Sequence, residues 1–506
     1  MPNAVLLLGL LVAVVRAQST ESVTFAVNVS NPGATFQRPW QMCIGSGHAL
    51  LGLRQDWREH LTNVRNDISP QYIRFHGVLD DDMSVVLCIL VNGQYQFFNL
   101  DELYDFILSI GMKPIVELSF MPEELASGSI TTIFHYKGNI TPPSDYSKWA
   151  QLVQAFVSHV VQRYGLDEVR TWKFEVWNEP NCGFWTGTQQ DYFTLYNWTA
   201  LAVKSIDAQI PVGGPATCQT GWISDFIDFA TSNKVPFDFV STHLYPTDPN
   251  VSPTPLGFAD TIRDACNTLG NANANVPLVV TEFNAGLGIP VLDQSYSVAF
   301  LFQQIQVFHC GLHSMCYRLD IFEEGGQDST PFQNGFGMQV NCVAETSQTV
   351  YGVPKPIYRG YQLLAEFAGD ALLPVTVSTG NSTVMAFCTL GSRHSNIHLY
   401  RPSVSCFISN FNNYGQPINN ATVTIQLGGA GSQLPPTATL LLIDDTHANP
   451  AALWEEMGSP LYPTQTEILK LQEASSVVPE LIQIESQQLS FQLNAQSAAV
   501  VTFELM

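Results

Sequence analysis

Two glutamates end apolar, β-rich runs and precede loop-forming residues, a position from which a carboxylate could do chemistry. Glu179 follows the run Phe174–Trp177, and Glu282 follows Val279-Val280-Thr281. Paired carboxylates at a cavity mouth suit glycosidic cleavage, because one group protonates the leaving oxygen while the other attacks the anomeric carbon. Glu179 could instead be a turn or helix-capping residue, and Glu282 a surface acid. Asn178, directly before Glu179, favours the chemical interpretation.

The elements that must position these residues alternate along the middle of the chain. Short β-rich runs are separated by helical stretches, which is typical of βα units around a parallel sheet. The eight predicted strands are Trp40–Ile44, Tyr72–Val78, Lys113–Phe120, Lys173–Trp177, Ile210–Gly214, Phe237–His243, Leu278–Phe283 and Ser314–Asp320. Eight such units predict an α/β fold, a (β/α)8 TIM barrel over residues 40–369. Glu179 and Glu282 then end the fourth and seventh strands, across the barrel mouth from each other.

The remainder of the chain changes character beyond Gly369. The helical period disappears, and strand-like segments lie between Gly, Pro, Asn and Ser turns. These segments are Thr383–Thr389, Ser405–Asn410, Ala421–Leu427, Ala438–Ile443, Leu489–Leu493 and Ala498–Glu504. Residues 370–506 are therefore predicted to form an accessory β-sandwich, which residues 18–39 could join through the run Ser22–Val29.

The first residues have the pattern of a secretory signal peptide. An apolar run over residues 4–15 leads to Val15-Arg16-Ala17, a small-x-small site that would be cleaved after Ala17. An N-terminal membrane anchor is the alternative. No later segment reaches the 18 or so apolar residues that spanning a bilayer needs, so no membrane association is expected after cleavage. Six glycosylation sequons fit a secreted or lysosomal protein: Asn28, Asn139, Asn197, Asn250, Asn381 and Asn420.

Composition and cysteine spacing exclude several classes of function. The 506 residues carry a formal charge of −23, and polyanion binding draws on clustered Lys and Arg that this sequence lacks, so nucleic acid is not an expected partner. The ten cysteines include no C-x-x-C pair and lie near no His cluster, which argues against zinc and favours disulfides. Cys182 with Cys218, at the ends of neighbouring predicted strands, is one candidate pair. Cys43, within a strand-like run, could be a buried free thiol.

Several motifs together resemble glycoside hydrolase family 39, which contains β-xylosidases and α-L-iduronidases. Trp177-Asn178-Glu179-Pro180 with Thr281-Glu282-Phe283 is similar to the wider clan of retaining enzymes with catalytic acids on strands four and seven. The more specific motifs are Gly45-Ser46-Gly47-His48-Ala49, Arg74-Phe75-His76, Glu117-Leu118-Ser119-Phe120-Met121-Pro122, Ser241-Thr242-His243-Leu244-Tyr245-Pro246 and Asp320-Ile321-Phe322-Glu323-Glu324. The similarity runs from about residue 40 to Gly369 and is weak in the tail.

The resemblance implies a role for each matching position. It makes Glu179 the acid/base and Glu282 the nucleophile, with no metal or cofactor. The apolar neighbours Phe174 and Trp177 would favour the protonated form of an acid, and donors such as Arg74 or Tyr245 would keep a nucleophile ionised. The implied substrate-binding residues are Asn178, Arg74, His76, His243, Tyr245, Glu323 and Glu324. Phe120 is, by its residue type, a candidate sugar-stacking platform, although an aromatic ring in a barrel more often belongs to the core.

The sequence thus predicts a secreted retaining exo-glycosidase, most similar to a β-D-xylosidase, whose partner is a carbohydrate substrate. An α-L-iduronidase is the nearest alternative, but that branch carries a lysine shortly after its strand-six histidine, where this chain has Leu244-Tyr245-Pro246. A catalytically silent carbohydrate-binding barrel is the alternative from another class, and retention of both glutamates argues against it. The oligomeric state does not follow from the sequence.

Overall fold

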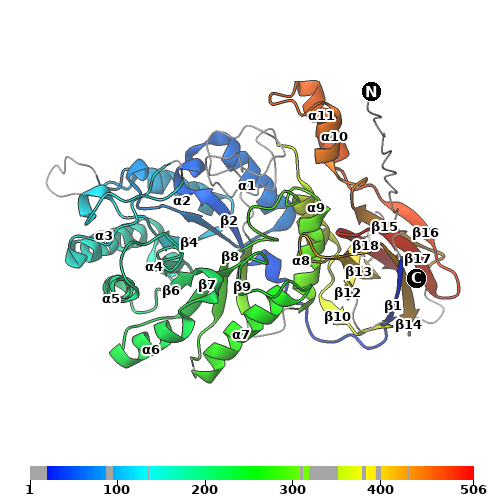
Figure 1. The fold of residues 1–506 in the computed structure, drawn as a ribbon, viewed down its shortest axis with the longest axis horizontal. Helices are drawn as coiled ribbons and strands as arrows, with labels where there is room; N and C mark the ends of the chain where they lie inside the picture. The colour runs from blue at the N-terminus through cyan, green and yellow to red at the C-terminus, as the bar shows by residue number, and fades with distance from the viewer. Residues whose placement is uncertain are drawn as a thin grey trace, which may run out of the picture.

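A barrel and a two-sheet sandwich lie side by side in the computed structural model (Figure 1). The structure describes residues 20–86, 95–134, 136–272, 274–307, 312–317, 352–378, 383–394, 400–429 and 434–505. Within this part of the chain, no helix combines the length and apolar character needed to cross a bilayer.

Eight parallel strands close the barrel, as the alternating pattern predicts. They are β2 (Cys43–His48), β3 (Tyr72–His76), β4 (Lys113–Leu118), β5 (Lys173–Val176), β6 (Val212–Thr217), β7 (Phe239–Leu244), β8 (Leu278–Phe283) and β9 (Leu312–Tyr317). Each strand pairs with its neighbours in sequence, and β2 pairs with β9 to complete the ring. The C-terminal ends of these strands therefore meet at one face, which is where barrels of this kind carry their chemistry.

Helices surround the barrel (Figure 1). They are α1 (Gln55–Ile68), α2 (Phe98–Ser109), α3 (Tyr146–Tyr164), α4 (Leu166–Val169), α5 (Gln189–Ile206), α6 (Ile223–Asn233), α7 (Gly257–Asn271), α8 (Ser295–Val307) and α9 (Pro356–Phe367). Short 3-10 helices lie at Pro39–Gln41, Ala49–Leu53, Asp81–Met83, Glu123–Leu125 and Cys218–Thr220. In α3, the apolar stripe Trp149, Leu152, Val153, Phe156, Val160 and Val161 is buried apart from Val161, which is partly buried. This stripe has the 3.6-residue period of a one-sided helix.

The first barrel strand starts three residues later than predicted. Pro39–Gln41 form a 3-10 turn, and the strand runs on from Cys43 through Gly45-Ser46-Gly47 to His48. Glycines disfavour strands in isolation, but pairing with β3 and β9 overrides that preference here. The eighth strand ends at Tyr317, and the predicted residues beyond it lie outside the described part of the chain.

Two sheets form the sandwich. One sheet has the order β11 (Val375–Val377), β1 (Glu21–Asn28), β14 (Ala421–Gly428), β17 (Gln488–Leu493). The other has the order β10 (Ala371–Leu373), β12 (Val384–His394), β13 (Tyr400–Asn410), β18 (Ser497–Glu504), β15 (Thr437–Ile443), β16 (Glu480–Gln483). Strand β1 pairs in parallel with β14, so a segment from the start of the chain lies inside the C-terminal sandwich.

The sequence predicts a tail without helices, and this prediction is wrong. Two helices, α10 (Pro450–Glu456) and α11 (Gln465–Ala474), interrupt the strands. Both begin with recognisable caps, because Asn449 accepts from the backbone of Ala452 and Thr464 forms a capping box with Glu467. These cap signals were present in the sequence, but short segments carry too little periodicity to stand out.

Helix α8 joins the two parts. Its Phe300 and Phe302 rings contact Phe411 and Phe407 of the sandwich, with ring centroids 5.5 Å and 5.4 Å apart. These residues belong to one continuous apolar core that extends from the barrel into the sandwich. Burial of large aromatic rings is the main stabilising contribution in such a contact, so the sandwich supports the barrel wall that carries α8.

Candidate active site

Glu179 and Glu282 meet at the C-terminal face of the barrel. Glu282 lies within β8, and Glu179 lies three residues beyond the end of β5. One carboxylate oxygen of each lies within 4.8 Å of the other. The Glu179 side chain is 13% exposed and the Glu282 side chain 6%. The two carboxylates therefore face each other across a narrow, mostly dry space.

Hydrogen-bond donors and two imidazole rings surround Glu282. The Tyr245 hydroxyl donates to its Oε1, and Nη1 of Arg74 lies 3.3 Å from its Oε2. The ring nitrogens His76 Nε2 and His243 Nδ1 lie 3.9 Å and 3.6 Å from the same Oε2. Donors and positive charge stabilise the ionised form of a carboxyl group, so this environment favours a carboxylate at Glu282.

Arg74 is itself held by two buried acids. Its Nη2 lies 2.7 Å from Glu117 Oε2, and its Nε donates to Glu175 Oε2 at 2.6 Å. Burial lowers the pKa of Arg74, but the charges of Glu117, Glu175 and Glu282 outweigh it and raise that pKa, so the guanidinium stays charged. Nη2 also donates to Asn178 Oδ1 at 3.0 Å, which fixes the amide beside Glu179.

Glu117 links this network to His76. His76 Nδ1 lies 2.7 Å from Glu117 Oε2, and the Ser119 hydroxyl donates to Glu117 Oε1. Burial raises the pKa of Glu117, but the charges of Arg74 and His76 outweigh it and leave that pKa below its ordinary value. A fully buried carboxylate is stable only when its lone pairs are satisfied in this way.

Glu179 contacts a separate chain of polar groups. His243 Nδ1 lies 2.9 Å from Glu179 Oε1, and His243 Nε2 lies 3.2 Å from Thr281 Oγ1. The Thr281 hydroxyl donates to Glu175 Oε1 at 2.7 Å, so it accepts from the Nε2–H of His243. Nδ1 of a neutral His243 is then an acceptor, and it matches a protonated Glu179. A doubly protonated His243 matches the ionised carboxylate instead, so the pair can share one proton.

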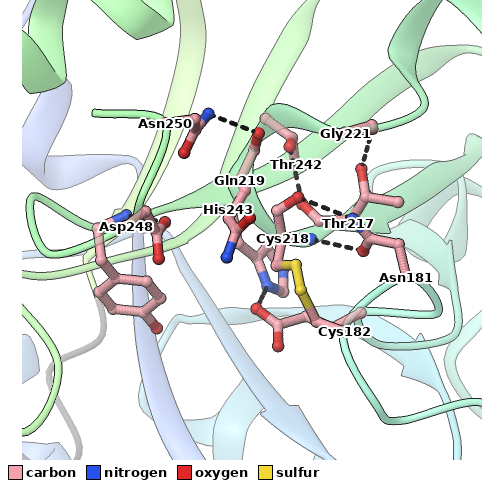
Figure 2. The surroundings of a disulfide bond; sticks show 12 residues. Asn181, Cys182, Thr217, Cys218, Gln219, Gly221, Thr242, His243, Asp248 and Asn250 are labelled. Carbon is pink, nitrogen blue, oxygen red and sulfur yellow. Dashed lines mark hydrogen bonds and ion pairs between the residues drawn. A yellow bond between two sulfur atoms is a disulfide. The ribbon is translucent and has the colours of Figure 1, made fainter. Parts of the chain in front are cut away.

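The backbone at Glu179 is held in an uncommon conformation. Trp177 and Glu179 have φ of 71° and 42°, in the left-handed region that costs a non-glycine residue roughly 1–3 kcal/mol. The Glu179 N–H donates to the carbonyl of Ala216 at 2.8 Å, and Cys182 forms a disulfide with Cys218 (Figure 2). The disulfide predicted for these two cysteines is thus confirmed.

Comparisons with known proteins agree with this geometry. A model of the family "Glycosyl hydrolases family 39" matches residues 23–486. The chain belongs to this family. It is therefore a glycoside hydrolase, and a carbohydrate is its substrate.

Relatives of the chain within family 39 cover most of its length. A β-xylosidase of Caldicellulosiruptor saccharolyticus is 38% identical over 485 residues, which are 91% of this chain and 94% of the relative. A β-xylosidase of Geobacillus stearothermophilus is 36% identical over 373 residues, 69% of this chain and 72% of the relative. The solved structure of a family 39 β-xylosidase from Caulobacter crescentus matches with a TM-score of 0.78 and 26% identity, covering 95% of this chain and 99% of that one.

Most of the predicted site residues of this family 39 chain come together. Arg74, His76, Asn178, His243 and Tyr245 all lie in the network around the two glutamates. Glu323 and Glu324 lie outside the described residues, so their contact with a sugar stays a prediction.

Phe120 lies at the same face but is completely buried. Its ring centroid is 5.8 Å from that of Trp177 and 6.4 Å from that of Phe184. A platform that stacks on a sugar needs an accessible ring face, and in this structure Phe120 has none. It supports the side chains beneath the site, and a direct contact with substrate stays a prediction.

Sequence reasoning did not nominate Glu117, Glu175 or Asp248. Glu117 and Glu175 interrupt the apolar strand runs Pro-Ile-Val-Glu-Leu and Lys-Phe-Glu-Val, and an acid inside a buried strand is rarely left unpaired. Asp248, in the loop after β7, accepts from the backbone N–H of Tyr245 at 2.8 Å. Burial raises the pKa of Asp248 to about 6, and the charges of Glu179 and Glu282 add to the rise. No local signal distinguished Asp248 from other loop acids.

A second polar cluster includes two acids of the run Asp80-Asp81-Asp82, which by its sequence alone predicts a solvated turn. Asp80 is buried and Asp82 partly buried, and His48 Nε2 lies 3.8 Å and 2.7 Å from their Oδ2 atoms. The expectation of a solvated turn is therefore wrong for Asp80. One nitrogen or carboxylate oxygen from each of His48, Asp80 and Asp82 lies within 4.8 Å of the others, close enough for the three to bind a metal ion. The same is true of Glu179, His243 and Glu282. Direct His–carboxylate contacts at 2.7 Å and 2.9 Å account for the short approach in each group.

Proposed function

We propose that this glycoside hydrolase is a retaining β-D-xylosidase that acts by double displacement, with Glu179 as acid/base and Glu282 as nucleophile. The observation that carries the proposal is the approach of the two carboxylates to within 4.8 Å, oxygen to oxygen. Retaining enzymes hold these groups about 5–5.5 Å apart, whereas inverting enzymes need about 6.5–9.5 Å to admit a water molecule. The relatives named β-xylosidases support the choice of sugar.

In the first step, Glu179 gives its proton to the glycosidic oxygen while a Glu282 oxygen attacks the anomeric carbon. The bond to the leaving alcohol breaks, and a glycosyl ester forms on Glu282. Tyr245 and Arg74 hold Glu282 ionised and oriented before the attack. When its ring is neutral, His243 Nδ1 is placed 2.9 Å from Glu179 Oε1 to accept that proton in a hydrogen bond before the reaction.

In the second step, the Glu179 carboxylate takes a proton from water, and the resulting hydroxide equivalent attacks the anomeric carbon from the original side. The ester breaks, Glu282 is released as a carboxylate, and the sugar leaves with its original configuration. The Asn178 amide, whose oxygen accepts from Arg74, is free to offer its N–H groups to the hydroxyl next to the anomeric carbon. That contact strengthens as positive charge develops on the ring.

The charge of the site favours a neutral pentose over a uronic acid. Glu117, Glu175 and Asp248 surround the two central glutamates, and the guanidinium of Arg74 is already engaged by three acids. A uronate carboxylate brought into this space would meet like charges in a region of low dielectric constant. This argument supports a xyloside over an α-L-iduronide.

A panel of chromogenic glycosides tests the choice of sugar. We expect hydrolysis of nitrophenyl β-D-xyloside well ahead of the α-L-iduronide, and proton NMR should find β-xylose as the first product. A faster iduronide would overturn the xylosidase assignment, and α-xylose as first product would overturn retention. Activity on neither, with measurable sugar binding, would favour a silent carbohydrate-binding barrel.

We also propose that the chain enters the secretory pathway and is cleaved after Ala17. Two disulfides, Cys182–Cys218 and Cys388–Cys406, and the exposed sequons Asn28 and Asn250 support this placement. Cys43 is also disulfide-bonded, so the free thiol expected there is wrong. Asn139 is buried and donates to the Gly128 carbonyl at 2.8 Å, so we expect no glycan there. N-terminal sequencing of protein from a eukaryotic secretion host should begin at Gln18.

A further inference from the structure

The segment that carries Glu179 extends beyond the sheet that supports it. Strands β5 and β6 pair at Phe174 with Val212 and at Glu175 with Gly213. Glu179 lies four residues beyond the last of these pairs. Other links must therefore hold its backbone against the end of β6.

Three links connect the two segments beyond the ladder. The Glu179 N–H donates to Ala216 O at 2.8 Å. The Asn181 amide pairs with the backbone of Cys218 in both directions, each at 3.0 Å. The third link is covalent, the disulfide between Cys182 and Cys218 (Figure 2). Together they fasten residues 179–182 to residues 216–218.

The backbone on both sides needs this restraint. Trp177 and Glu179 have positive φ, and so do Ala216, Gln219 and Thr220, at 52°, 58° and 52°. Residues with a Cβ leave the left-handed region readily unless the surroundings hold them there. Hydrogen bonds alone can exchange with water, whereas a disulfide removes the freedom of the two segments to separate.

The same crosslink lies beside the partner of Glu179. The Thr242 hydroxyl donates to the Thr217 carbonyl at 2.8 Å, which packs the β6 end against β7 next to His243. His243 directly follows Thr242, and its Nδ1 contacts Glu179, three residues before Cys182 (Figure 2). Movement of the bridged segment would therefore change the 2.9 Å contact between His243 Nδ1 and Glu179 Oε1.

We propose that the Cys182–Cys218 disulfide is a positioning crosslink for the acid/base, so that full proton donation by Glu179 requires the oxidised pair. The inference rests on the proposed role of Glu179. Cys182 and Cys218 are positioning residues and take no part in the chemical steps.

A double variant, Cys182→Ser with Cys218→Ser, tests the proposal through its leaving-group dependence. A dinitrophenyl xyloside needs little protonation, whereas xylobiose depends on the general acid, whose contribution is about 10²–10⁴-fold. We expect kcat/KM for xylobiose to fall about tenfold more than kcat/KM for the dinitrophenyl xyloside. A purely structural crosslink would lower both rates by the same factor.

Cys388→Ser with Cys406→Ser provides the matched control. These residues face each other inside the long β12–β13 ladder of the sandwich, where paired residues run continuously on both sides. We expect this variant to lose thermal stability while the ratio of the two kcat/KM values stays at the native value. An equal change of ratio in both double variants, or a native ratio in the Cys182/Cys218 variant, overturns the proposal.

Two further measurements separate the possible failures. Glu179→Ala, assayed with the same two substrates, must show strong leaving-group dependence; if it does not, the acid/base assignment fails and the proposal falls with it. If the Cys182/Cys218 variant does not fold, the native protein is titrated with a phosphine reductant while mass spectrometry follows thiols at 182 and 218 and near-UV circular dichroism follows the fold. A ratio that stays constant as these thiols appear, or free thiols there before any reductant is added, also overturns the proposal.

Discussion

The Nδ1 atom of His243 lies 2.9 Å from Oε1 of Glu179. Nε2 of the same ring is hydrogen-bonded to the Thr281 hydroxyl, so Nδ1 is the ring nitrogen that can exchange a proton with Glu179. We expect His243→Ala to lower kcat/KM for xylobiose about 10²-fold, with a smaller loss on a dinitrophenyl xyloside. His243→Asn, which can keep a polar atom near the Nδ1 position, should recover part of the activity. Equal losses on the two substrates would assign His243 to structure alone.

The nucleophile can be identified by trapping. Glu282→Ala should lower activity at least about 10³-fold and leave the fold intact, because the side chain is not part of the apolar core and Arg74 keeps its contacts with Glu117 and Glu175. A 2-fluoroxyloside inactivator should label Glu282 in the native protein and leave Glu282→Ala unlabelled. Peptide mass spectrometry that places the label on Glu117, Glu175 or Glu179 would contradict the assignment.

The acid/base can be identified by rescue. Glu179→Ala should retain much of its kcat/KM on a dinitrophenyl xyloside, because that leaving group needs no proton. Azide should then raise the turnover of this variant by attacking the glycosyl ester in place of activated water. The expected product is the β-xylosyl azide. A variant that azide does not rescue, or an α-azide, would count against the role.

Arg74 is expected to matter for stability as well as for activity. Arg74→Met leaves Glu117 and Glu175 buried without their partner, and breaking a buried ion pair in this way costs about 3–5 kcal/mol. Denaturant unfolding should report this loss in the free energy of unfolding. As a control, Arg54→Met removes an exposed ion pair with Asp56, which contributes at most about 1 kcal/mol. A similar loss in free energy of unfolding for both variants would contradict this prediction, because removing the buried ion pairs would then cost no more than removing an exposed one.

The stability of the protein should depend on pH through Asp80. Burial raises the pKa of Asp80 to about 7 from an ordinary value of 3.8. Between these values the folded protein keeps a proton that the unfolded chain has released, so Asp80 lowers stability as pH rises from about 4 to 7. Asp80→Asn removes this titration, and we expect its stability relative to the native protein to rise by about 2–3 kcal/mol between pH 5 and pH 8. Thermal unfolding at both pH values measures it.

Asp167→Asn serves as the control for the pH experiment, because the Asp167 side chain is fully exposed. Its stability relative to the native protein should not change with pH over the same range. If the stability difference between Asp80→Asn and the native protein is the same at both pH values, ionisation of Asp80 does not destabilise the fold and the prediction is wrong.

The barrel could be predicted because each strand is a short apolar run, and each helix carries one buried stripe. Leu278–Phe283 is predicted to the residue, whereas the first strand is displaced because Gly45-Ser46-Gly47 has no strand preference of its own. Its pairing is imposed by neighbours distant in sequence.

In the site, Glu179 and Glu282 were predictable because both end strands, where barrel chemistry occurs. Glu117 and Glu175 lie one layer deeper, and their function depends on meeting Arg74 from a third strand. Contact between side chains of three strands depends on the register of those strands around the barrel, and the local sequence pattern does not encode that register. Asp248 depends on the course of a loop, which turns back so that Asp248 exchanges hydrogen bonds with the Tyr245 backbone.

The parallel pairing of β1 with β14 has a consequence for synthesis on the ribosome. Val27 is in register with Val375 of β11 and Glu21 with Ala421 of β14, so an early strand must wait until most of the polypeptide has emerged before either partner exists. The neighbouring sheet is completed only by β18, the last strand of the chain. During translation the nascent barrel therefore carries an unpaired strand edge at its leading end, a surface to which chaperones and aggregation both respond. Final closure of the sandwich, and with it the support for α8, is a post-translational event.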